Sequence, residues 1–438
     1  MRALIDDLRA RDELLIIQRE VDPRHELAAV TKAVQQSSNS SVLFENVRGT
    51  SLPVATNLYN SRQRLCRMLG AEPDGFCQRW NGLHDETQAM VGADTTVVDR
   101  PGDLVDCRIS DLPQITYHER DAGPYFTSAL FLAKHPETGA ENLSFHRAMV
   151  VGDSELRVRL GASHDLCTYQ KLAEERGEYL EAAMLIGAEP ELFMSGCASL
   201  PIDWSEMAFA SAMKGEPIER YPGKSVDLMI PAATQVVIEG RFIPNVRRPE
   251  GPFGEFLGYY VEVGDNTVFE VLNVYTQPSP VFHSLLCGSN EDISLLEART
   301  AAKTYRHLSQ LVPGIIDVAC APSVMNTSIK INQLYEGHAR QVLMAAFAGH
   351  LDYNKVCIVV DEDVDIFDMS EVMWAFVTRG RADTRTMVIP DVPGFYRDEH
   401  KDHWGRLGLD ATMPFGREAE FQRKSVPGET TINLADYL

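Results

Sequence analysis

The stretch Arg247-Arg248-Pro249-Glu250-Gly251-Pro252-Phe253-Gly254-Glu255-Phe256-Leu257-Gly258-Tyr259-Tyr260 decides how the rest of the sequence is interpreted. Two carboxylates in it, Glu250 and Glu255, are separated by Gly-Pro-Phe-Gly. This spacer excludes a helix interior, because proline lacks an amide donor and fixes φ, while glycine raises the entropy cost of ordering. Two interpretations remain. One is a surface loop with incidental charge; the other is a glycine-bounded loop that approaches a flat ligand and aims both carboxylates inward.

The composition is that of a globular protein long enough for two or three domains. The chain has 438 residues, 44% of them hydrophobic and 24% charged, and a formal net charge of −22. This acidity argues against a nucleic-acid partner and against an anionic membrane surface. The eight cysteines show no CxxC spacing, as expected of reduced thiols. With neither a signal-peptide pattern nor a long apolar run, the sequence predicts a cytoplasmic protein without a membrane span.

The first two thirds of the sequence predict two domains with different patterns of secondary structure. Short helices and strands over residues 1–110 predict an N-terminal α+β domain, within which the segment 76–105 has no clear pattern. Frequent short strands between Gly and Pro turns predict a β-barrel-like domain over residues 111–295. Two helices interrupt it, Asp165–Arg176 and Ser205–Met213, the second with Ser205 as its N-cap.

The last third, residues 296–438, changes to an α/β pattern. A period of 3.6 residues predicts helices over Ile293–Leu308 and Ile331–Ala348. The nearly continuous apolar runs Lys355–Val360 and Thr386–Pro390 are typical of buried parallel strands. The predicted fold class is therefore mixed α+β, with an α+β domain, a central barrel and a C-terminal α/β domain.

Upstream of the two glutamates, four polar residues could carry chemistry, and each has a plainer alternative. Arg147, at a strand start, could be a carboxylate-binding fork, or an exposed or structurally paired arginine. His164 could be a ligand or a hydrogen-bonded loop residue, and Glu206 lies in a first helical turn, where the dipole already favours a carboxylate. Together, the Asn142 amide, the His164 imidazole and the Glu206 carboxylate suit a Mn²⁺ or Mg²⁺ site that keeps positions open for phosphate oxygens.

Several familiar motifs are excluded. The acidic run Asp361–Asp365 cannot begin an EF-hand loop, because Ile366 and Val372 occupy the positions that need glycine and glutamate. The sequence also contains no Gly-x-Gly-x-x-Gly, no Gly-x-x-x-x-Gly-Lys-Ser/Thr and no Gly-x-Ser-x-Gly. Dinucleotide-binding, Walker-type and serine-hydrolase interpretations therefore lose their usual support.

The combination resembles the UbiD-like decarboxylases, which use prenylated FMN. The Pro-Glu-Gly-Pro-Phe-Gly-Glu block with an upstream Asn-x-Ser-x-x-Arg is highly specific to this group. The motifs that carry the resemblance follow one another in the expected order over most of the chain: Asp121–Ser128, Pro136–Gly139, Asn142–Arg147, Glu206, Glu239-Gly240, Pro249–Gly258, Val359–Asp365 and Gly408–Thr412.

The resemblance implies a fold and a site. The middle domain should be a flavin-reductase-like split β-barrel that binds prenylated FMN, and the C-terminal domain should help to form homodimers or homohexamers. Arg147, Glu250 and Glu255 match the catalytic network. Asn142, His164 and Glu206 match the ligands of a divalent cation, usually Mn²⁺, that bridges to the cofactor phosphate, with K⁺ beside it. The positions that match cofactor-binding residues are Thr127, Asn142, Ser144, Phe145, Arg147, Ser163, His164, Cys197, Glu206 and Arg406.

The implied reaction is the reversible, non-oxidative decarboxylation of an aromatic, heteroaromatic or α,β-unsaturated carboxylic acid through a covalent adduct with prenylated FMN. Arg147 would orient the carboxylate and Glu255 would donate the proton. General acid catalysis contributes only about 10²–10⁴-fold, so the cofactor must carry the rest. The implied partners are a small aromatic or unsaturated acid, CO₂, and a prenyl-flavin synthase that supplies the cofactor.

One departure from the resemblance concerns the substrate. Some relatives that act on furan or pyrrole acids have Leu-Leu-Pro-Gly followed by Glu-His, whereas this chain has Leu285-Leu286-Cys287-Gly288 and then Glu291-Asp292. We therefore expect a mono-acid with a small aromatic or heteroaromatic ring rather than a dicarboxylate. The alternatives are a flavin-dependent reductase and a non-catalytic subunit of a carboxylase assembly. The presence of all three catalytic and all three metal positions speaks against the second.

Overall fold

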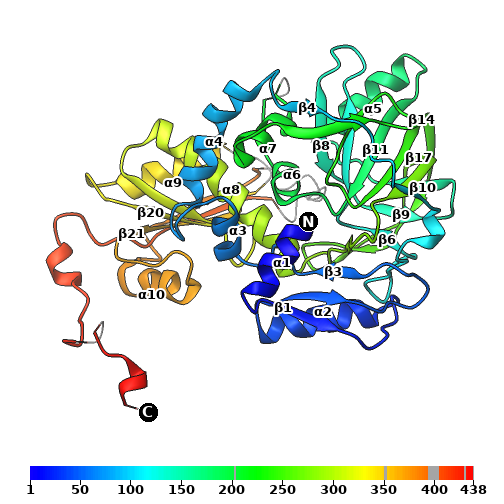
Figure 1. The fold of residues 1–438 in the computed structure, drawn as a ribbon. Coiled ribbons are helices and arrows are strands. Elements are labelled where there is room, and N and C mark those ends of the chain that lie inside the picture. The colour runs from blue at the N-terminus through cyan, green and yellow to red at the C-terminus, as the bar shows by residue number, and fades with distance from the viewer. Residues whose placement is uncertain (202–203, 350–352, 393–403, 429–430, 438) are drawn as a thin grey trace. The chain divides into compact units, whose positions relative to one another are not determined.

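The computed structural model describes residues 1–201, 204–349, 353–392, 404–428 and 431–437. The chain forms two compact units, Met1–Lys303 and Thr304–Leu438, coloured blue to yellow-green and yellow to red in Figure 1. Both units combine helices with sheets, which confirms the mixed class expected from the sequence. Among the described residues, no helix is long and apolar enough to cross a membrane.

The N-terminal part of the first unit is a four-stranded sheet of order β1-β2-β3-β18. Its last strand comes from far along the sequence, and Phe282 pairs with Val54. Leu27 and Ala28 share a hydrophobic core with Val42 and Phe44, so α2 packs on this sheet. The elements of this part are α1 (Arg2–Ala10), β1 (Leu14–Ile17), α2 (Glu26–Ser37), β2 (Ser41–Phe44), β3 (Val54–Thr56), α3 (Arg62–Met68), α4 (Phe76–Met90) and β18 (Phe282–His283).

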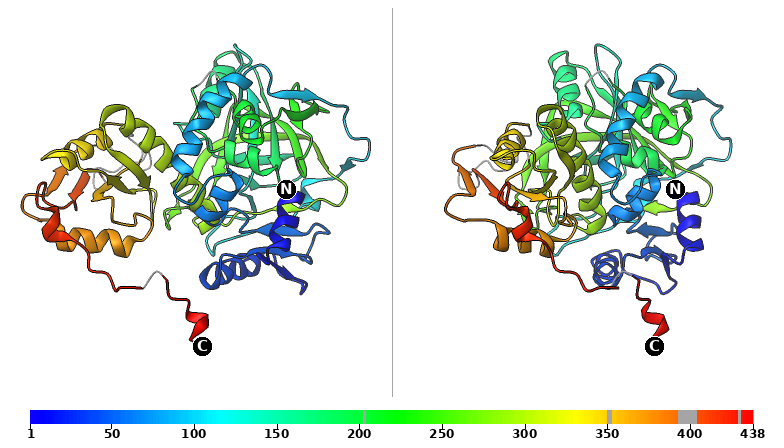
Figure 2. Two further views of the ribbon diagram at one scale, coloured as in Figure 1. Left: turned by 60° about the vertical axis from the view of Figure 1, so that its left-hand side comes forward. Right: turned by 90° about the vertical axis from the view of Figure 1, so that its left-hand side faces the viewer.

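The centre of the first unit is a nine-stranded antiparallel sheet that curls like half a barrel (Figures 1 and 2). Its order is β6-β9-β10-β17-β14-β11-β7-β8, and β5 pairs with β17. The strands are β5 (Val105–Asp106), β6 (Tyr125–Phe126), β7 (Leu130–Lys134), β8 (Glu141–Phe145), β9 (Ala148–Val150), β10 (Glu155–Val158), β11 (Leu180–Ile186), β14 (Val236–Glu250) and β17 (Gly264–Thr276).

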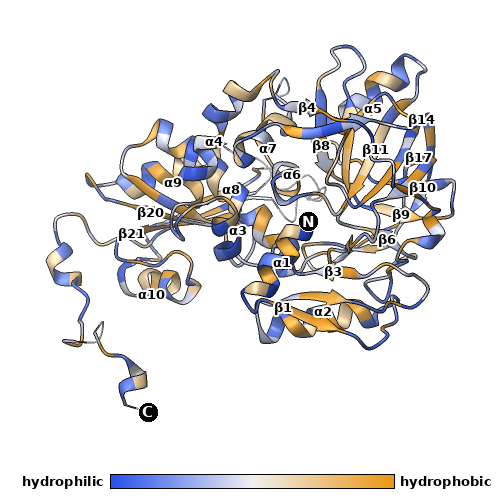
Figure 3. Ribbon diagram, in the orientation of Figure 1, coloured by the Kyte–Doolittle hydropathy of each residue, from blue (hydrophilic) through white to orange (hydrophobic). Residues whose placement is uncertain are grey.

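The two faces of this sheet bury two different cores. In β11, Met184 and Ile186 join one core, whereas Ala183 and Leu185 join the other. This follows from the period of two along a strand, and it explains why β11 is apolar almost throughout (orange in Figure 3). Leu166 of α5 belongs to the first core.

Helices α6 and α7 cover the second core, to which they contribute Leu192 and Met207. Ser205 caps α7 as expected, because its hydroxyl accepts the Met207 amide at 3.0 Å. The remaining elements of this part are η1 (Ile109–Asp111), α5 (Asp165–Glu175), α6 (Pro190–Ser195), α7 (Glu206–Lys214), the sheet of β4 (Thr95–Val97), β12 (Ile218–Pro222) and β13 (Met229–Pro231), and the hairpin of β15 (Phe253–Gly254) and β16 (Tyr260–Val261).

The second unit is a five-stranded sheet of order β19-β20-β21-β23-β22. Strands β20, β21 and β23 are parallel, while β19 and β22 run antiparallel at the edges. The helix α8 crosses the boundary between the units. The elements are α8 (Asn290–Leu311), β19 (Ile315–Ala319), β20 (Asn326–Ile331), α9 (His338–Gly349), β21 (Val356–Asp361), α10 (Met369–Arg379), β22 (Thr386–Ile389), β23 (Arg406–Asp410), η3 (Glu418–Phe421) and η4 (Leu434–Asp436).

Three expectations about elements need correction. Residues 76–90 form a regular helix, α4, where the sequence showed no clear pattern. The helix expected over Ile331–Ala348 begins only at His338, because Ile331 ends β20 and Gly337 takes a φ of +83°. Strand β22 is not a buried parallel strand: it is a partly exposed antiparallel edge.

Gly240 provides a test of the central sheet. A Cβ on this residue would lie 2.2 Å from the Glu270 carbonyl oxygen and 2.6 Å from the Phe269 ring, at a register shift between β14 and β17. We expect Gly240→Ala to lower the free energy of unfolding by about 3 kcal/mol, because neither backbone nor ring can yield. Gly152→Ala, which has open space around it, is the control. Equal denaturation midpoints for the two variants would contradict this packing.

Glu297 of α8 provides a test by pH. Its Oε1 is buried without a hydrogen-bond partner in the part of the chain that the structure describes, and burial raises its pKa to about 8. The folded protein thus holds this proton more tightly than the unfolded chain, so stability is lost as the pH rises from about 4.5 to about 8.

We expect Glu297→Gln to remove this loss, which is on the order of 5 kcal/mol at most. The variant should gain thermal stability over the native chain at pH 8.5 and gain little at pH 4. Glu175→Gln, an exposed position in α5, should show no such difference. A pH-independent effect of Glu297→Gln would disprove the assignment.

Candidate active site

An arginine and two glutamates meet at one end of the curled sheet. Arg147 lies between β8 and β9, Glu250 ends β14, and Glu255 follows β15. Nε and Nη2 of Arg147 donate to the two oxygens of Glu250, each at 3.0 Å, and Nη1 donates to Oε1 of Glu255. The Glu250 side chain is fully buried, and those of Arg147 and Glu255 are 9% exposed.

The turn between the two glutamates depends on Gly251. Strand β14 continues to Glu250, so the stretch Arg247–Tyr260 begins as the end of this strand and continues as the hairpin that starts with β15. Gly251 has a φ of +95°, a conformation that L side chains rarely adopt, and this turn redirects the chain into β15. Asp121 then fixes β15, because its carboxylate accepts the Gly254 amide at 2.8 Å.

Glu250 has partners that the sequence did not reveal. The Tyr125 hydroxyl donates to its Oε1 and the Asn266 amide to its Oε2, both at 2.9 Å. The Arg147 guanidinium also lies 4.6 Å from the centroid of the Phe253 ring. Burial and Glu250 both raise the pKa of Tyr125. Burial alone would lower the pKa of Arg147, but the carboxylates outweigh it and raise that pKa. This makes Arg147 a permanently charged, rigidly held fork.

The expected metal ligands lie around β8. The Asn142 Oδ1 accepts the Ser144 hydroxyl at 2.8 Å, and the neighbouring Leu143 amide donates to Glu206 Oε2 at 2.9 Å. His164 precedes α5, and its ring centroid lies 5.1 Å from that of His146, which hydrogen-bonds to Ser144. Glu206 thus contacts the backbone of β8 beside Asn142, and His164 lies next to His146, which follows the end of the same strand.

The donors around Glu206 suit a cation. Burial, assisted by the neighbouring carboxylates of Asp165 and Glu141, raises the pKa of Glu206 to about 8. A divalent ion would stabilise the ionised form in such an enclosed acidic place. The described residues include no group of three His, Cys, Asp or Glu side chains arranged for a metal. A metal site formed by Asn142, His164 and Glu206 would therefore depend on the Asn142 amide oxygen as a ligand and on positions left open for phosphate oxygens.

The other expected cofactor positions are spread over the first unit. Thr127 shares a hydrogen bond with the Tyr117 hydroxyl at 2.8 Å, and Phe145 packs edge-on against Phe193, with centroids 4.8 Å apart. Ser163 is exposed in the turn before α5. Cys197, after α6, is half-buried, and burial raises its thiol pKa to about 12.

Arg406 belongs to β23 of the second unit, where its side chain is buried. Its role toward the cofactor phosphate stays a prediction.

Two further residues that the sequence did not single out as functional border the cluster. Asp292, in the first turn of α8, accepts the Gly288 amide at 2.7 Å and hydrogen-bonds to the Cys287 thiol. Burial raises the pKa of Asp292 to about 6, and Glu255 adds to this shift. Glu255 and Arg147 also influence the pKa of Cys287, which burial raises well above its ordinary value. Departure from the Leu-Leu-Pro-Gly pattern was the one signal in this segment.

Comparison with known proteins identifies the family. The N-terminal, Rift-related and C-terminal domains of 3-octaprenyl-4-hydroxybenzoate carboxy-lyase (UbiD) match residues 5–82, 93–290 and 293–411. The anhydromevalonate phosphate decarboxylase of Methanothermobacter thermautotrophicus is 31% identical over 97% of this chain and 99% of its own length. The chain belongs to the UbiD family. It is a carboxy-lyase, as the sequence predicted.

Solved UbiD structures agree over the whole chain. The UbiD-class enzyme HmfF from Pelotomaculum thermopropionicum, in complex with FMN, is 32% identical, with a TM-score of 0.92 over 100% of this chain and 99% of that one. An evolved dimeric form of HmfF in complex with prenylated FMN is 31% identical, with a TM-score of 0.89 over 100% of this chain and 99% of that one. The vanillic acid decarboxylase of Sedimentibacter hydroxybenzoicus is 25% identical, with a TM-score of 0.86 over 98% of this chain and 96% of that one.

Proposed function

We propose that this UbiD-family enzyme reversibly decarboxylates an aromatic, heteroaromatic or α,β-unsaturated carboxylic acid with the help of prenylated FMN. One observation carries the proposal: the buried fork of Arg147, locked by Glu250 on one side and touching Glu255 on the other. The UbiD relatives support it, since one is an anhydromevalonate phosphate decarboxylase, one a vanillic acid decarboxylase, and HmfF binds prenylated FMN.

Arg147 would bind the substrate carboxylate. Its bonds to the glutamates use Nε, one N–H of Nη1 and one of Nη2, so each terminal nitrogen keeps an N–H for an incoming carboxylate. Tyr125 and Asn266 hold Glu250, and Glu250 in turn fixes the plane of the guanidinium. The substrate would therefore meet a preorganised, water-poor donor pair rather than a flexible one.

Glu255 would return a proton to the carbon that loses CO₂. Glu255 contacts Arg147 through Oε1 and is 9% exposed, whereas the fully buried Glu250 binds both Nε and Nη2, so we assign the proton transfer to Glu255. Prenylated FMN, when bound, supplies the electron sink that a localised carbanion on an sp² carbon lacks. The protein's share is to orient the acid, exclude water and deliver the proton.

Residues of the first unit would hold the cofactor. Thr127, Ser144, Phe145, Ser163 and Cys197 would line the flavin. Asn142, His164 and Glu206 would bind the divalent cation, Mn²⁺ or Mg²⁺, that bridges to the phosphate, with K⁺ nearby. Arg406 would complete the phosphate site. We further propose that a prenyl-flavin synthase supplies the cofactor and that the enzyme works as a homodimer or homohexamer.

Co-expression with a prenyl-flavin synthase tests this function. The purified enzyme should release CO₂ from members of a panel of aryl and alkenoic acids. It should do so without oxidising a nicotinamide, which would instead indicate a flavin-dependent reductase. Failure to decarboxylate any acid of the panel, with prenylated FMN bound, would refute the proposal.

Glu255→Gln tests the proton donor. We expect the variant to keep its cofactor but to lose about 10²–10⁴-fold in kcat, together with deuterium incorporation from solvent at the product carbon, because glutamine cannot donate the proton. Glu262→Gln, an exposed neighbour, should behave like the native enzyme. Native turnover in Glu255→Gln would remove Glu255 from the mechanism.

His164→Ala tests the metal site. We expect it to lose both the divalent ion and the flavin, because the cation links the protein to the cofactor phosphate. Metal content by elemental analysis and flavin absorbance after gel filtration measure the two losses. His135→Ala, in the turn after β7, should retain both. Full occupancy in His164→Ala would contradict the assignment.

A further inference from the structure

The hairpin that carries Glu255 is very short. Strands β15 and β16 have two residues each, whereas even a longer isolated hairpin is only marginally stable in water. Glu255 follows β15 directly, and its backbone closes the turn, since its amide donates to the Tyr259 carbonyl at 2.8 Å. The position of the Glu255 carboxyl group therefore depends on the groups outside the hairpin that hold it in place.

Asp121 holds the first strand of this hairpin. Its Oδ1 accepts the Gly254 amide at 2.8 Å, and its Oδ2 accepts the His118 amide at 2.9 Å. The Asp121 side chain is fully buried, and hydrogen bonds to an ionised group are stronger than those between neutral groups. One carboxylate thus ties the residue directly before Glu255 to a segment 133 residues earlier in the chain.

The same segment also holds the rest of the hairpin. The Ala122 amide donates to the Pro252 carbonyl at 3.0 Å, just before β15. On β16, the Tyr260 hydroxyl accepts the Arg120 amide at 3.3 Å, and the Arg120 guanidinium lies 4.8 Å from the centroid of the Tyr260 ring. Residues 118–122 therefore contact both strands of the hairpin.

The His118 ring is a spacer between this segment and the hairpin. It lies edge-on to Phe253 and Tyr260, with centroids 6.5 and 6.4 Å apart, and its Nδ1 is 3.5 Å from Oδ2 of Asp121. A Cβ on Gly254 would lie 2.5 Å from Nδ1 and 2.7 Å from Cγ of this ring. Gly254 has no positive φ, so the close approach of the ring accounts for the glycine.

The chain that follows this segment holds the other acid. Tyr125, shortly after Asp121, donates to Oε1 of Glu250 at 2.9 Å. Asp121 secures the backbone before Glu255, and Tyr125 secures Glu250 directly. One short stretch of chain therefore sets the distance between the carboxylate-binding fork of Arg147 and the proposed proton donor.

We propose that Asp121 is a positioning residue for proton transfer: it holds Glu255 in place for the carbon that loses CO₂, with the His118 ring as the spacer. The contacts of Arg147 with Glu250 do not involve Asp121. Loss of Asp121 therefore impairs proton delivery and leaves carboxylate binding intact. This inference rests on the proposed function, in which Glu255 donates the proton.

Asp121→Asn tests this hold. Asparagine has one accepting oxygen in place of two, so one of the two backbone amides would face its NH₂ group. We expect the holoenzyme to lose about 10–100-fold in kcat on an acid that the native enzyme decarboxylates, because a small misplacement of a reacting group has a large effect on the rate. The KM and the bound flavin should stay native, and the solvent deuterium isotope effect on kcat should rise, since proton transfer becomes slower. A raised KM with native kcat would overturn the inference.

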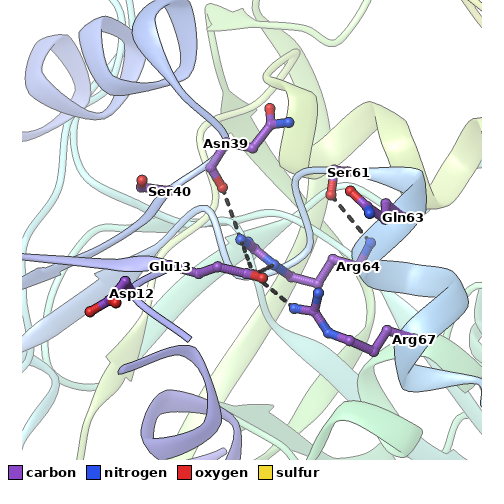
Figure 4. Close-up of a pocket in the computed structure, with 8 residues that line it drawn as sticks. All are labelled: Asp12, Glu13, Asn39, Ser40, Ser61, Gln63, Arg64 and Arg67. Carbon is purple, nitrogen blue, oxygen red and sulfur yellow. Dashed lines mark hydrogen bonds and ion pairs between the residues drawn. The ribbon is translucent and has the colours of Figure 1, made fainter. Parts of the chain in front are cut away.

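Glu13→Gln is the matched control. Figure 4 shows Arg64 and Arg67 converging on the Glu13 carboxylate, at 2.9 and 2.7 Å, in a pocket that contains none of the proposed site residues. This variant should lower the melting temperature but leave kcat and the isotope effect at their native values. Equal changes of kcat and isotope effect in the two variants would reduce Asp121 to a structural residue and refute its positioning role.

Gly254→Ala tests the spacer. We expect it to lower kcat, because the three atoms nearest to the new Cβ all belong to the His118 ring. The double variant His118→Ala/Gly254→Ala should regain most of the lost activity, since the ring is then absent. No recovery in the double variant would contradict the role given to the ring.

Hydrogen exchange separates this inference from the proposed function. Followed by mass spectrometry, the backbone amides of residues 253–261 should exchange about tenfold faster in Asp121→Asn than in the native holoenzyme, because the hairpin opens more often. Unchanged exchange would sink the inference and leave the decarboxylase proposal intact. Faster exchange in a protein whose native form decarboxylates no acid would instead place the failure in the proposed function.

Discussion

The buried ion pair between Arg147 and Glu250 is the constraint on which the site depends. Taking both charges out of water is tolerable only because each finds several partners. Glu250 accepts from Nε and Nη2 along one edge of the guanidinium, from Tyr125 and from Asn266, and so its oxygens are fully used. These contacts come from β6, β14 and β17 and from the segment between β8 and β9, so the curled sheet must be complete for the pair to exist.

Around this pair the protein gathers more acid than base. Glu255 and Asp292 add two carboxyl groups beside one guanidinium, and burial holds the pKa of Asp292 near 6. Burial thus shifts Asp292 toward its proton-bearing form.

The sequence predicted which three residues meet at this site, but not the neighbours that hold them. Arg147, Glu250 and Glu255 were found because they stand in motifs that resemble a family, and the structure brings all three together. Tyr125 and Asn266 could not be found in that way. Their contact with Glu250 depends on sheet pairing, such as Glu250 opposite Gly264 beyond a register shift in β14, which no local pattern specifies.

The missed and misplaced elements have local causes. Helix α4 buries Phe76, Trp80, Leu83, His84 and Thr87, so two polar residues interrupt its apolar stripe, and its N-cap, Gly75, makes no side-chain capping bond. The predicted helix joined the apolar end of β20 to α9, because the turn at Gly337 does not clearly interrupt the pattern of hydrophobic residues. Strand β22 is apolar enough for an interior strand, and its place at the edge follows only from the topology of the sheet.

The separation of Arg147 from the two glutamates along the chain also governs when the site can form. Arg147 is joined to Glu250 across 103 residues and to Glu255 across 108. Closing loops of that length costs entropy that only the paired strands between them can offset. The nascent polypeptide therefore has no such cluster until β14 and β17 have left the ribosome and paired. A cofactor that depends on this site can bind only afterwards, to a chain that is already folded.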